Sequence, residues 1–412
     1  MLSEEHLYKL MTMGAPHRFV IGDDPSKVHD TDENRIAKSV KTLANLIKKV
    51  VDTEDKLFSL NAKRKASEHI HTTHTGGRLA TAIAKQLPQL EEYFPDHAYN
   101  RYIELLRKQV RKRPELEAIK PHLKLVRGAQ AIEVWSQLDA LVNELREDGR
   151  SSKFKAELDA RRRQCEKNQQ SAVAYIDAIF KYRASKNVVI RIDLANGSET
   201  SDRRGITMSV DAEQARRELD KFLRYVREHY PLTGYLGTFE YGLMTGYHFH
   251  LLIFIDGHQA FRASALAKRF GEYWKNVITE GRGRYFNCNA AWYQEKGIGM
   301  VWHDDYFKRH LLLSVVLPYL TKMDFWLKFE GTKKTFFKGL MPEEVMRPGR
   351  PRRTRARSSW WLRQRVRNGD VCDQKSDDQQ ENFERLLGLV RQGSDGNSSA
   401  SRSLFCIAST FD

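Results

Sequence analysis

The sequence predicts an α+β protein built on an antiparallel-rich sheet with helices on one face. Residues 236–257 (LGTFEYGLMTGYHFHLLIFIDG) carry the clearest pattern, because two strand-like runs flank a turn with a Gly at each end. The elements around this hairpin follow the order that such a sheet needs: a β-branched strand at 187–194, an amphipathic helix at about 211–229, the hairpin, and a helix at about 262–278. Together they indicate one sheet-containing domain within the chain.

The flanking parts differ from this domain in composition. Residues 1–167 are polar and mainly helical, with helices expected at about 36–50, 97–112 and 129–147 and a polar connector at 62–77. Residues 168–342 form the sheet domain, which begins with a helix at about 170–183 and includes a strand-like run at 205–210. Residues 343–412 begin Arg-rich and become low in complexity, so we expect a largely disordered tail.

The charge of the chain favours a nucleic-acid partner. Its 412 residues carry 69 Lys and Arg against 53 Asp and Glu, and a net charge of +16 attracts phosphate polyanions. The 4 cysteines are widely spaced, so neither a disulfide framework nor a zinc knuckle is expected. No apolar stretch is long enough to cross a bilayer and the N-terminus lacks a signal-peptide core, which predicts a cytoplasmic protein without a membrane partner.

A candidate metal site lies in the hairpin. His248 and His250 are two positions apart on a strand, so their imidazoles point to the same face. If residues 242–246 close the hairpin with Tyr241 opposite Tyr247, Glu240 falls opposite His248 on that face. Two imidazoles and a carboxylate are a ligand set for an open divalent-metal site.

Two further features bear on this assignment. Phe249, Leu251, Ile253 and Ile255 would pack beneath the helices, which leaves the histidine face open. A chain with 14 His contains about 0.5 His-x-His pairs by chance, and a second pair does occur at His69 and His71. That second pair has no apolar strand attached, so we interpret it as part of a solvated loop.

Tyr319 is the candidate nucleophile. It lies in Tyr-Leu-Thr-Lys, and on a helix Lys322 would share its face. A neighbouring cation lowers the cost of ionising a phenol and can also pair with a phosphate. Tyr306 is the rival, but it follows Asp304 and Asp305, and anionic neighbours raise the pKa of a phenol.

Interleaved basic and aromatic residues are candidates for DNA contacts. Arg282, Arg284 and Tyr285 can hold a single strand by backbone charge and base stacking, although aromatic residues of this segment can equally cover the core. The Arg-rich run adds a second candidate set, which comprises Arg352, Arg353 and Arg355.

These motifs together resemble the HUH endonucleases, which nick single-stranded DNA at replication origins. The order and spacing are similar to the inovirus-type replication-initiation proteins, a family that includes the YagK/YfjJ C-terminal domains of bacterial prophage elements. The resemblance covers about residues 170–342 and rests on these segments: Glu240 to Gly246, His248, His250, Tyr273-Trp274, residues 281–289, 297–299, 319–322 and 338–342.

The resemblance implies an HUH-type sheet with the two histidines central and the tyrosine on a following helix. His248 and His250 then match the metal ligands, Tyr319 the nucleophile and Lys322 its basic companion. Glu240 and Asp193 compete for the place of third ligand. The first strand (NVVIRIDL) departs from the Thr-rich pattern of such initiators, and Phe337 stands where a Gly is expected.

The leading hypothesis is a rolling-circle-type replication initiator. It would nick single-stranded or origin DNA through a 5′-phosphotyrosyl intermediate, with Mg²⁺ or Mn²⁺ as its cofactor. The alternatives are a non-catalytic prophage DNA-binding regulator and a single-tyrosine transposase. We expect the N-terminal helices to bind origin duplex or a host helicase, with host polymerase as a further possible partner.

Overall fold

The computed structural model describes residues 18–20, 28–30, 32–61, 68–117, 123–196, 210–242, 246–291, 296–321, 325–331 and 334–344. Several predicted features therefore lie outside the described residues. They are the strand-like run up to residue 209, the side chain of Lys322, and the tail from residue 345 with Arg352, Arg353 and Arg355.

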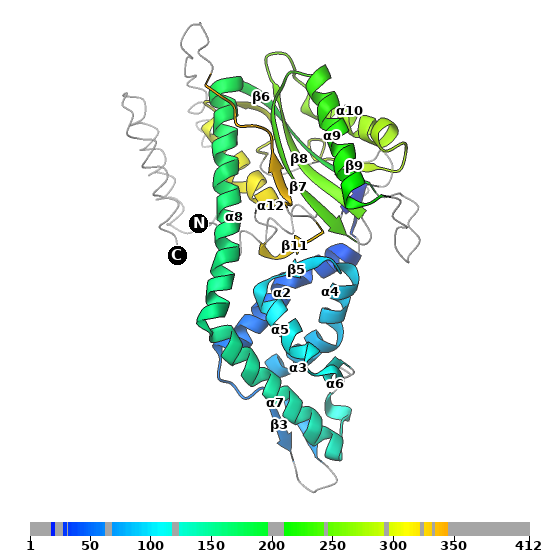
Figure 1. Cartoon of the computed structure of the whole chain (residues 1–412), viewed down its shortest axis with the longest axis vertical. Helices are drawn as coiled ribbons and strands as arrows, with labels where there is room; N and C mark the ends of the chain where they lie inside the picture. The colour runs from blue at the N-terminus through cyan, green and yellow to red at the C-terminus, as the bar shows by residue number, and fades with distance from the viewer. Residues whose placement is uncertain are drawn as a thin grey trace, which may run out of the picture.

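The first part of the chain is mainly helical, as predicted, and ends in a long helix (Figure 1). The apolar positions of the first helix, such as Val40, Leu43 and Ile47, are buried, as their steps of three and four require. The elements in order are β1 (Arg18–Val20), β2 (Val28–Asp30), α2 (Asp32–Asp52), β3 (Phe58–Asn61), β4 (His69–Thr72), α3 (His74–Thr81), η1 (Ala82–Gln86), α4 (Leu87–Tyr93), β5 (His97–Tyr99), α5 (Arg101–Arg111), α6 (Pro114–Glu117), η2 (Leu123–Leu125), α7 (Gly128–Arg150) and α8 (Ser152–Ala178).

Two predictions for this part are wrong. Residues 69–72 of the expected connector form β4, which pairs with β3, and residues 74–81 form α3. Thr73 caps α3 by accepting a hydrogen bond from the Gly76 amide, which is why a helix begins in so polar a segment. The helix expected from residue 97 begins at Arg101, because residues 97–99 form β5 and Asn100 caps the helix.

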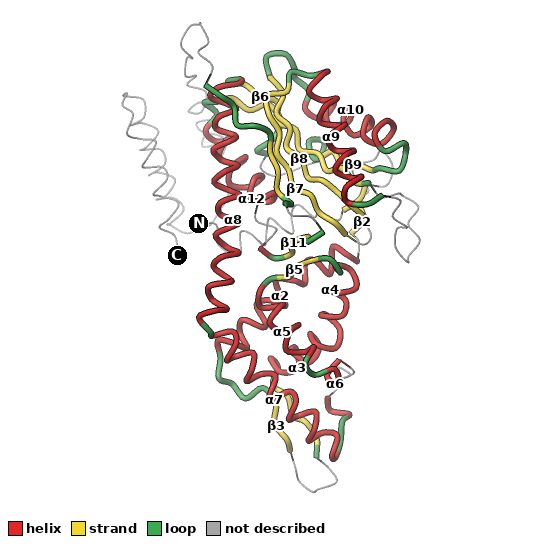
Figure 2. The backbone as a smooth tube through the Cα atoms, in the orientation of Figure 1, coloured by secondary structure: helices red, strands yellow, loops and turns green. Residues whose placement is uncertain are grey.

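The second part contains the main sheet and the helices that cover it (Figure 2). In α9 the stripe formed by Ala215, Leu219, Phe222, Leu223 and Val226 is buried, as the pattern predicts. Asp211 caps the helix by accepting a hydrogen bond from the Gln214 amide. The elements in order are η3 (Ile179–Arg183), β6 (Lys186–Ala195), α9 (Ala212–His229), β7 (Leu232–Gly242), β8 (Gly246–Asp256), α10 (Ala263–Tyr273), η4 (Trp274–Ile278), β9 (Arg284–Asn287), β10 (Gly299–Trp302), α11 (Tyr306–Leu311), η5 (Leu312–Val316), α12 (Leu317–Thr321), β11 (Leu327–Phe329) and β12 (Phe336–Lys338).

The main sheet is antiparallel, in the order β10-β6-β8-β7-β12 among the described strands, with β9 also paired to β6. The predicted hairpin register is confirmed, because Glu240 lies opposite His248 and Tyr241 opposite Tyr247. The first strand fixes a further pair, since Asp193 lies opposite His250. The strands that carry the candidate site are therefore the three central ones.

Helices cover both faces of this sheet, so the prediction of helices on one face only is wrong. Phe249, Leu251, Ile253 and Ile255 pack beneath α9 and α10, as predicted. The opposite face also carries apolar residues, including Leu252 and Phe254, and these pack against the end of α8, η3, η5 and α12. Both faces of β8 are apolar, which requires cover on both sides and closes the face that was expected to be open.

Asn289 fills a gap in the edge of the sheet. β10 pairs with residues 186–189 of β6 and β9 with residues 192–195, so neither strand pairs with the positions between them. There the buried Asn289 side chain acts as a substitute strand: its Oδ1 accepts from the Arg191 amide at 2.8 Å and its Nδ2 donates to the Val189 carbonyl at 3.1 Å. The Arg191 amide and the Val189 carbonyl of β6 thereby have hydrogen-bond partners.

We expect Asn289→Ala to lower the free energy of unfolding by about 2 kcal/mol, because it leaves a buried amide and a buried carbonyl without partners. Asn276→Ala is the matched control, since Asn276 is exposed on η4 and its side chain donates to Glu272, at the end of α10. Its expected effect is below about 0.5 kcal/mol. Urea denaturation midpoints measure both, and equal midpoints would contradict the role of Asn289.

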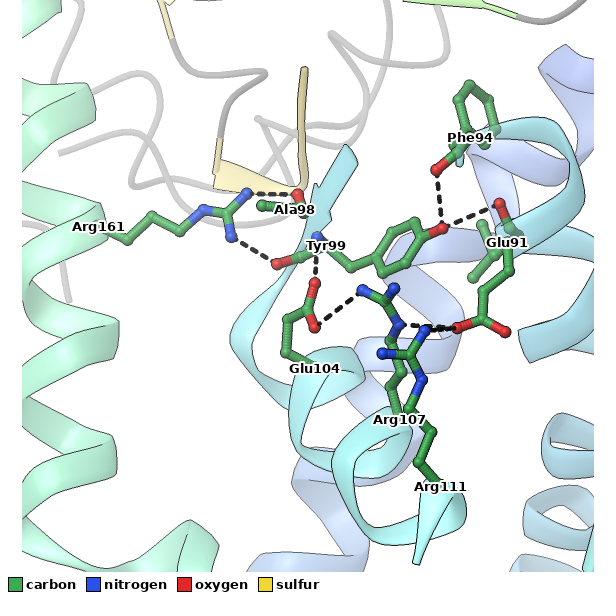
Figure 3. A network of polar contacts seen from close by, with 9 residues as sticks. Glu91, Phe94, Ala98, Tyr99, Glu104, Arg107, Arg111 and Arg161 are labelled. Atoms are coloured by element: carbon green, nitrogen blue, oxygen red, sulfur yellow. Dashed lines mark hydrogen bonds and ion pairs between the residues drawn. The ribbon is translucent and has the colours of Figure 1, made fainter. Parts of the chain in front are cut away.

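α8 joins the two parts of the chain without a break. Its Cys165 is buried in the core of the N-terminal helices, while Ala172 and Tyr175 belong to the core beneath the sheet. The predicted domain boundary after residue 167 falls inside this helix. Figure 3 shows that α8 is also hydrogen-bonded to β5, because the Arg161 guanidinium donates to the backbone carbonyls of Ala98 and Tyr99.

Among the described helices, none combines the length and the apolar character that crossing a bilayer requires.

Candidate metal centre

Glu240, His248 and His250 converge on one point of the sheet. Each offers one ligand atom, and these atoms lie within 4.8 Å of one another. The Nε2 atoms of His248 and His250 are both 3.4 Å from Oε2 of Glu240. Ligand atoms that share an ion about 2.1 Å away lie about 3.0 to 3.4 Å apart, so this spacing fits a divalent cation. Within the described part of the chain, no other group of three such residues has this arrangement.

The contacts of the other ring nitrogens direct both Nε2 atoms to that point. His248 Nδ1 lies 3.1 Å from the Gly246 carbonyl oxygen, which can only accept, so Nδ1 carries the proton. His250 Nδ1 lies 2.8 Å from Oδ1 of Asp193. Such partners on the far nitrogen fix the tautomer and ring orientation of metal-binding histidines.

Asp193 and Glu240 thus have different places in the structure. Glu240 faces the Nε2 atoms of both histidines, whereas Asp193 contacts the outer nitrogen of His250 alone. The geometry groups Glu240, and not Asp193, with the two histidines. Asp193 is instead the carboxylate that orients His250.

The charges of the site are strongly coupled. Burial opposes the charge on His250, but Asp193 and Glu240 outweigh burial and raise the pKa of its imidazole to about 9. Burial likewise opposes the charge on both carboxylates, yet the histidines hold the pKa of Glu240 well below its usual range, and His250 with Arg191 lowers that of Asp193. Two anionic carboxylates around two imidazoles suit a bound cation.

Tyr319 lies beside this group on α12. Its ring meets the His250 ring edge to face, with centroids 5.2 Å apart. The residue is only 2% exposed, and its hydroxyl has no hydrogen-bond partner among the described residues. Burial and the nearby Asp193 raise the pKa of the phenol well above its usual value, and Arg191 offsets only part of that rise.

No family model, no curated protein and no solved structure matches the chain. The chemistry of the site therefore has to follow from its own side chains.

Arg191 is the residue that the sequence reasoning missed. Its guanidinium carbon lies 4.2 Å from the centroid of the Tyr319 ring. Arg191 thus supplies the cation beside Tyr319 that the sequence predicts at Lys322. A signal was present in the strand sequence NVVIRIDL, because Arg191 and Asp193 are two charged residues on one face of an otherwise apolar strand. Charged residues are rarely buried without a partner or a function.

The remaining predicted residues that the structure describes are not members of the metal-ligand group. Arg282 forms an ion pair with the buried Glu218 at 2.8 Å, and Arg284 is half-buried on β9. The Tyr285 ring packs closely against Gly271 and its hydroxyl donates to Glu272, which favours the alternative that it covers the core. Tyr306 is 60% exposed at the start of α11.

The second His-x-His pair does not form a comparable group. His69 and His71 lie on β4 rather than in a loop, and His71 is exposed. His71 therefore provides a control for substitutions at His248 and His250.

Proposed function

We propose that this protein is a rolling-circle-type replication initiator that nicks single-stranded or origin DNA through Tyr319, with a Mg²⁺ or Mn²⁺ ion as cofactor. The observation that carries the proposal is the convergence, on one sheet face, of three metal-ligand side chains with a buried phenol whose hydroxyl lacks a partner among the described residues. A buried donor without a partner calls for an explanation, and a substrate phosphate oxygen would provide one.

Each residue of the site then has a defined task. Glu240, His248 and His250 would hold the ion, which would supply polarisation of the scissile phosphate. Asp193 keeps the lone pair of His250 Nε2 directed to the ligand point, and its contact of 2.8 Å is the basis for that role. Arg191 places a positive charge over the ring of the attacking tyrosine.

The chemical step is a transesterification. Oη of Tyr319 forms a bond to phosphorus while the bond from phosphorus to the 3′-oxygen breaks, and the phenolic proton ends on that 3′-oxygen. The products are a 5′-phosphotyrosyl link and a free 3′-hydroxyl from which polymerase can extend. Because the ester bond is conserved in the protein–DNA link, the strand can be rejoined without ATP.

A non-catalytic DNA-binding regulator is the second candidate, and one observation favours it. The buried groups can satisfy one another without an ion, because a protonated His250 lies between the carboxylates of Asp193 and Glu240. Tyr319 is also almost fully buried, which separates it from DNA in this arrangement. Both candidates use the net charge of +16 to bind DNA, and they differ in chemistry.

A covalent-adduct assay tests the proposal. Full-length protein is incubated with single-stranded DNA of the genetic element that encodes it and with Mn²⁺, and then run on a denaturing gel. We expect an adduct that EDTA prevents, while DNA binding survives EDTA and weakens as salt is raised. Protein that binds the DNA but yields no adduct across the element's sequence would favour the regulator.

A further inference from the structure

The segment that follows the tyrosine helix belongs to the core of the N-terminal helices. We call residues 325–331 the strap. Phe325 and Trp326 are 6% and 2% exposed, and both belong to the hydrophobic core that also contains residues of α2, α5 and α7. The strap therefore connects α12, which carries Tyr319, to a part of the chain more than 200 residues earlier.

Backbone hydrogen bonds fix the strap to β5. The Asn100 amide donates to the Trp326 carbonyl at 2.8 Å, and the Glu330 amide donates to the Asp96 carbonyl at 2.8 Å. Between these bonds β11 pairs with β5, with Leu327 opposite Tyr99 and Phe329 opposite His97. Asn100 also caps α5, so the residue that binds the strap is part of the N-terminal helical region.

Phe329 carries this attachment to the metal-ligand hairpin. Its ring lies 5.6 Å from the ring of Tyr241 and 5.9 Å from that of Tyr247, measured between centroids. Tyr241 and Tyr247 are the cross-strand pair next to Glu240 and His248. His97 of β5 contacts Phe329 and stacks on Tyr241. The aromatic cluster thus supports the hairpin from the sheet face opposite the metal ligands.

The tyrosine helix is held at a second point. Thr321, at the end of α12, donates to the Gln169 side chain of α8, and Gln169 donates to the Leu313 carbonyl at 3.1 Å. α8 is in turn bonded to β5 through Arg161. The chain of contacts from β5 therefore reaches the tyrosine helix through α8, on the face of the metal ligands, and the hairpin of Glu240 and His248 through Phe329, from the opposite face.

We propose that the strap and β5 are positioning elements of the nicking site, so that the N-terminal region is an integral part of that site rather than an attached DNA- or helicase-binding module. This inference rests on the proposed function. Phe329 and His97 fix the hairpin end that carries two of the metal ligands, while Phe325 and Trp326 fix the chain that leaves the tyrosine helix. Catalytic groups lose efficiency when they are misplaced by as little as about 1 Å, so such support matters.

Substitution of Phe329 tests the first half of the proposal. Phe329→Ala should weaken Mn²⁺ binding, measured by titration calorimetry, by about tenfold, as removal of a supporting residue does in other metal sites. Phe329→Leu, which retains most of the packing, should bind Mn²⁺ like the wild type. Leu138→Ala is the matched control, because Leu138 is fully buried on α7 and is part of neither the strap nor β5.

The control separates positioning from general loss of stability. Leu138→Ala should lower the melting temperature at least as much as Phe329→Ala but leave the Mn²⁺ affinity unchanged, both measured on protein that circular dichroism shows to be folded. Equal Mn²⁺ affinity in Phe329→Ala and wild type would overturn the inference. So would equal weakening in both variants.

A reversible crosslink tests the second half. Ala98 and Lys328 are half-buried cross-strand partners, and antiparallel partners have Cα atoms about 4.5 to 5.5 Å apart, within the range of a disulfide. In an Ala98→Cys, Lys328→Cys protein we expect a crosslink on oxidation, with adduct formation at the same rate before and after reduction. The two single-cysteine variants are the controls.

Four outcomes decide the inference. Failure to crosslink would contradict the pairing of β11 with β5, and adduct formation that stops on oxidation and returns on reduction would show that the strap must leave β5. Either result overturns a fixed positioning role. A wild-type protein that neither binds Mn²⁺ nor forms an adduct rejects the proposed function itself, and the inference with it. A wild type that does both while Phe329→Ala is unaffected rejects the inference alone.

Discussion

Tyr319→Phe is expected to abolish covalent adduct formation, by a factor of at least about 10⁴ in rate, while single-stranded DNA binds as it does to the wild type. The substitution removes only the attacking oxygen. The ring keeps its contacts with His250 and Arg191, and the lost hydroxyl has no hydrogen-bond partner among the described residues that would be left unsatisfied. Folding should therefore be unaffected.

The measurement is a denaturing gel for the adduct beside a filter-binding titration for affinity. Tyr306→Phe is the matched control, because Tyr306 is exposed whereas His248 and His250 are buried, and it should form the adduct at the wild-type rate. An adduct that survives Tyr319→Phe would place the nucleophile elsewhere. Equal loss of adduct and DNA affinity would show that Tyr319 is structural.

Glu240→Gln is expected to lower the affinity for Mn²⁺ by at least about 100-fold and to stop nicking with it. The substitution keeps the shape of the side chain but removes the negative charge whose oxygen lies 3.4 Å from both Nε2 atoms. Without that charge the site consists of two imidazoles and an orienting carboxylate, a weaker set for a hard divalent cation.

Titration calorimetry with Mn²⁺ alone gives the answer without any DNA. Asp193→Asn provides the graded comparison and should weaken Mn²⁺ binding by about 10- to 100-fold, because it affects only the orientation and basicity of His250. His71→Ala, in the other His-x-His pair, should have no effect. A larger loss in Asp193→Asn than in Glu240→Gln would reverse the roles assigned to the two carboxylates.

The hairpin register was predictable because its determinants are local. A Gly at each end of the turn and the alternation of the strands fix which residues oppose each other, and Glu240 accordingly lies opposite His248. The relation of β6 to β8 is set by tertiary packing over some 60 residues, so the local sequence left Asp193 and Glu240 as rivals. The register of β6 against β8 places Asp193 opposite His250, where it contacts the outer nitrogen of that imidazole.

The cover of the second sheet face was not predictable from alternation. The run LLIFI in β8 is apolar at every position, so it does not indicate which face a helix covers or whether both are covered. The structure uses both, and this burial makes Tyr319 and His250 nearly inaccessible. The position of the strap was not predictable either. The pairing of β11 with β5 joins segments far apart in the sequence, and no local pattern indicates which strands pair.

The continuity of α8 has a mechanical consequence. A helix of 27 residues is a rod about 40 Å long, and bending it sharply requires a proline, a bulge or an inserted side chain. Its two ends are embedded in different cores, so those cores cannot hinge at the boundary without breaking helical hydrogen bonds. A force or a partner acting on the N-terminal helices would be transmitted along this rod as torque on the sheet, with little loss to flexing. A partner that binds the N-terminal helices would therefore act on the sheet through a rigid connection.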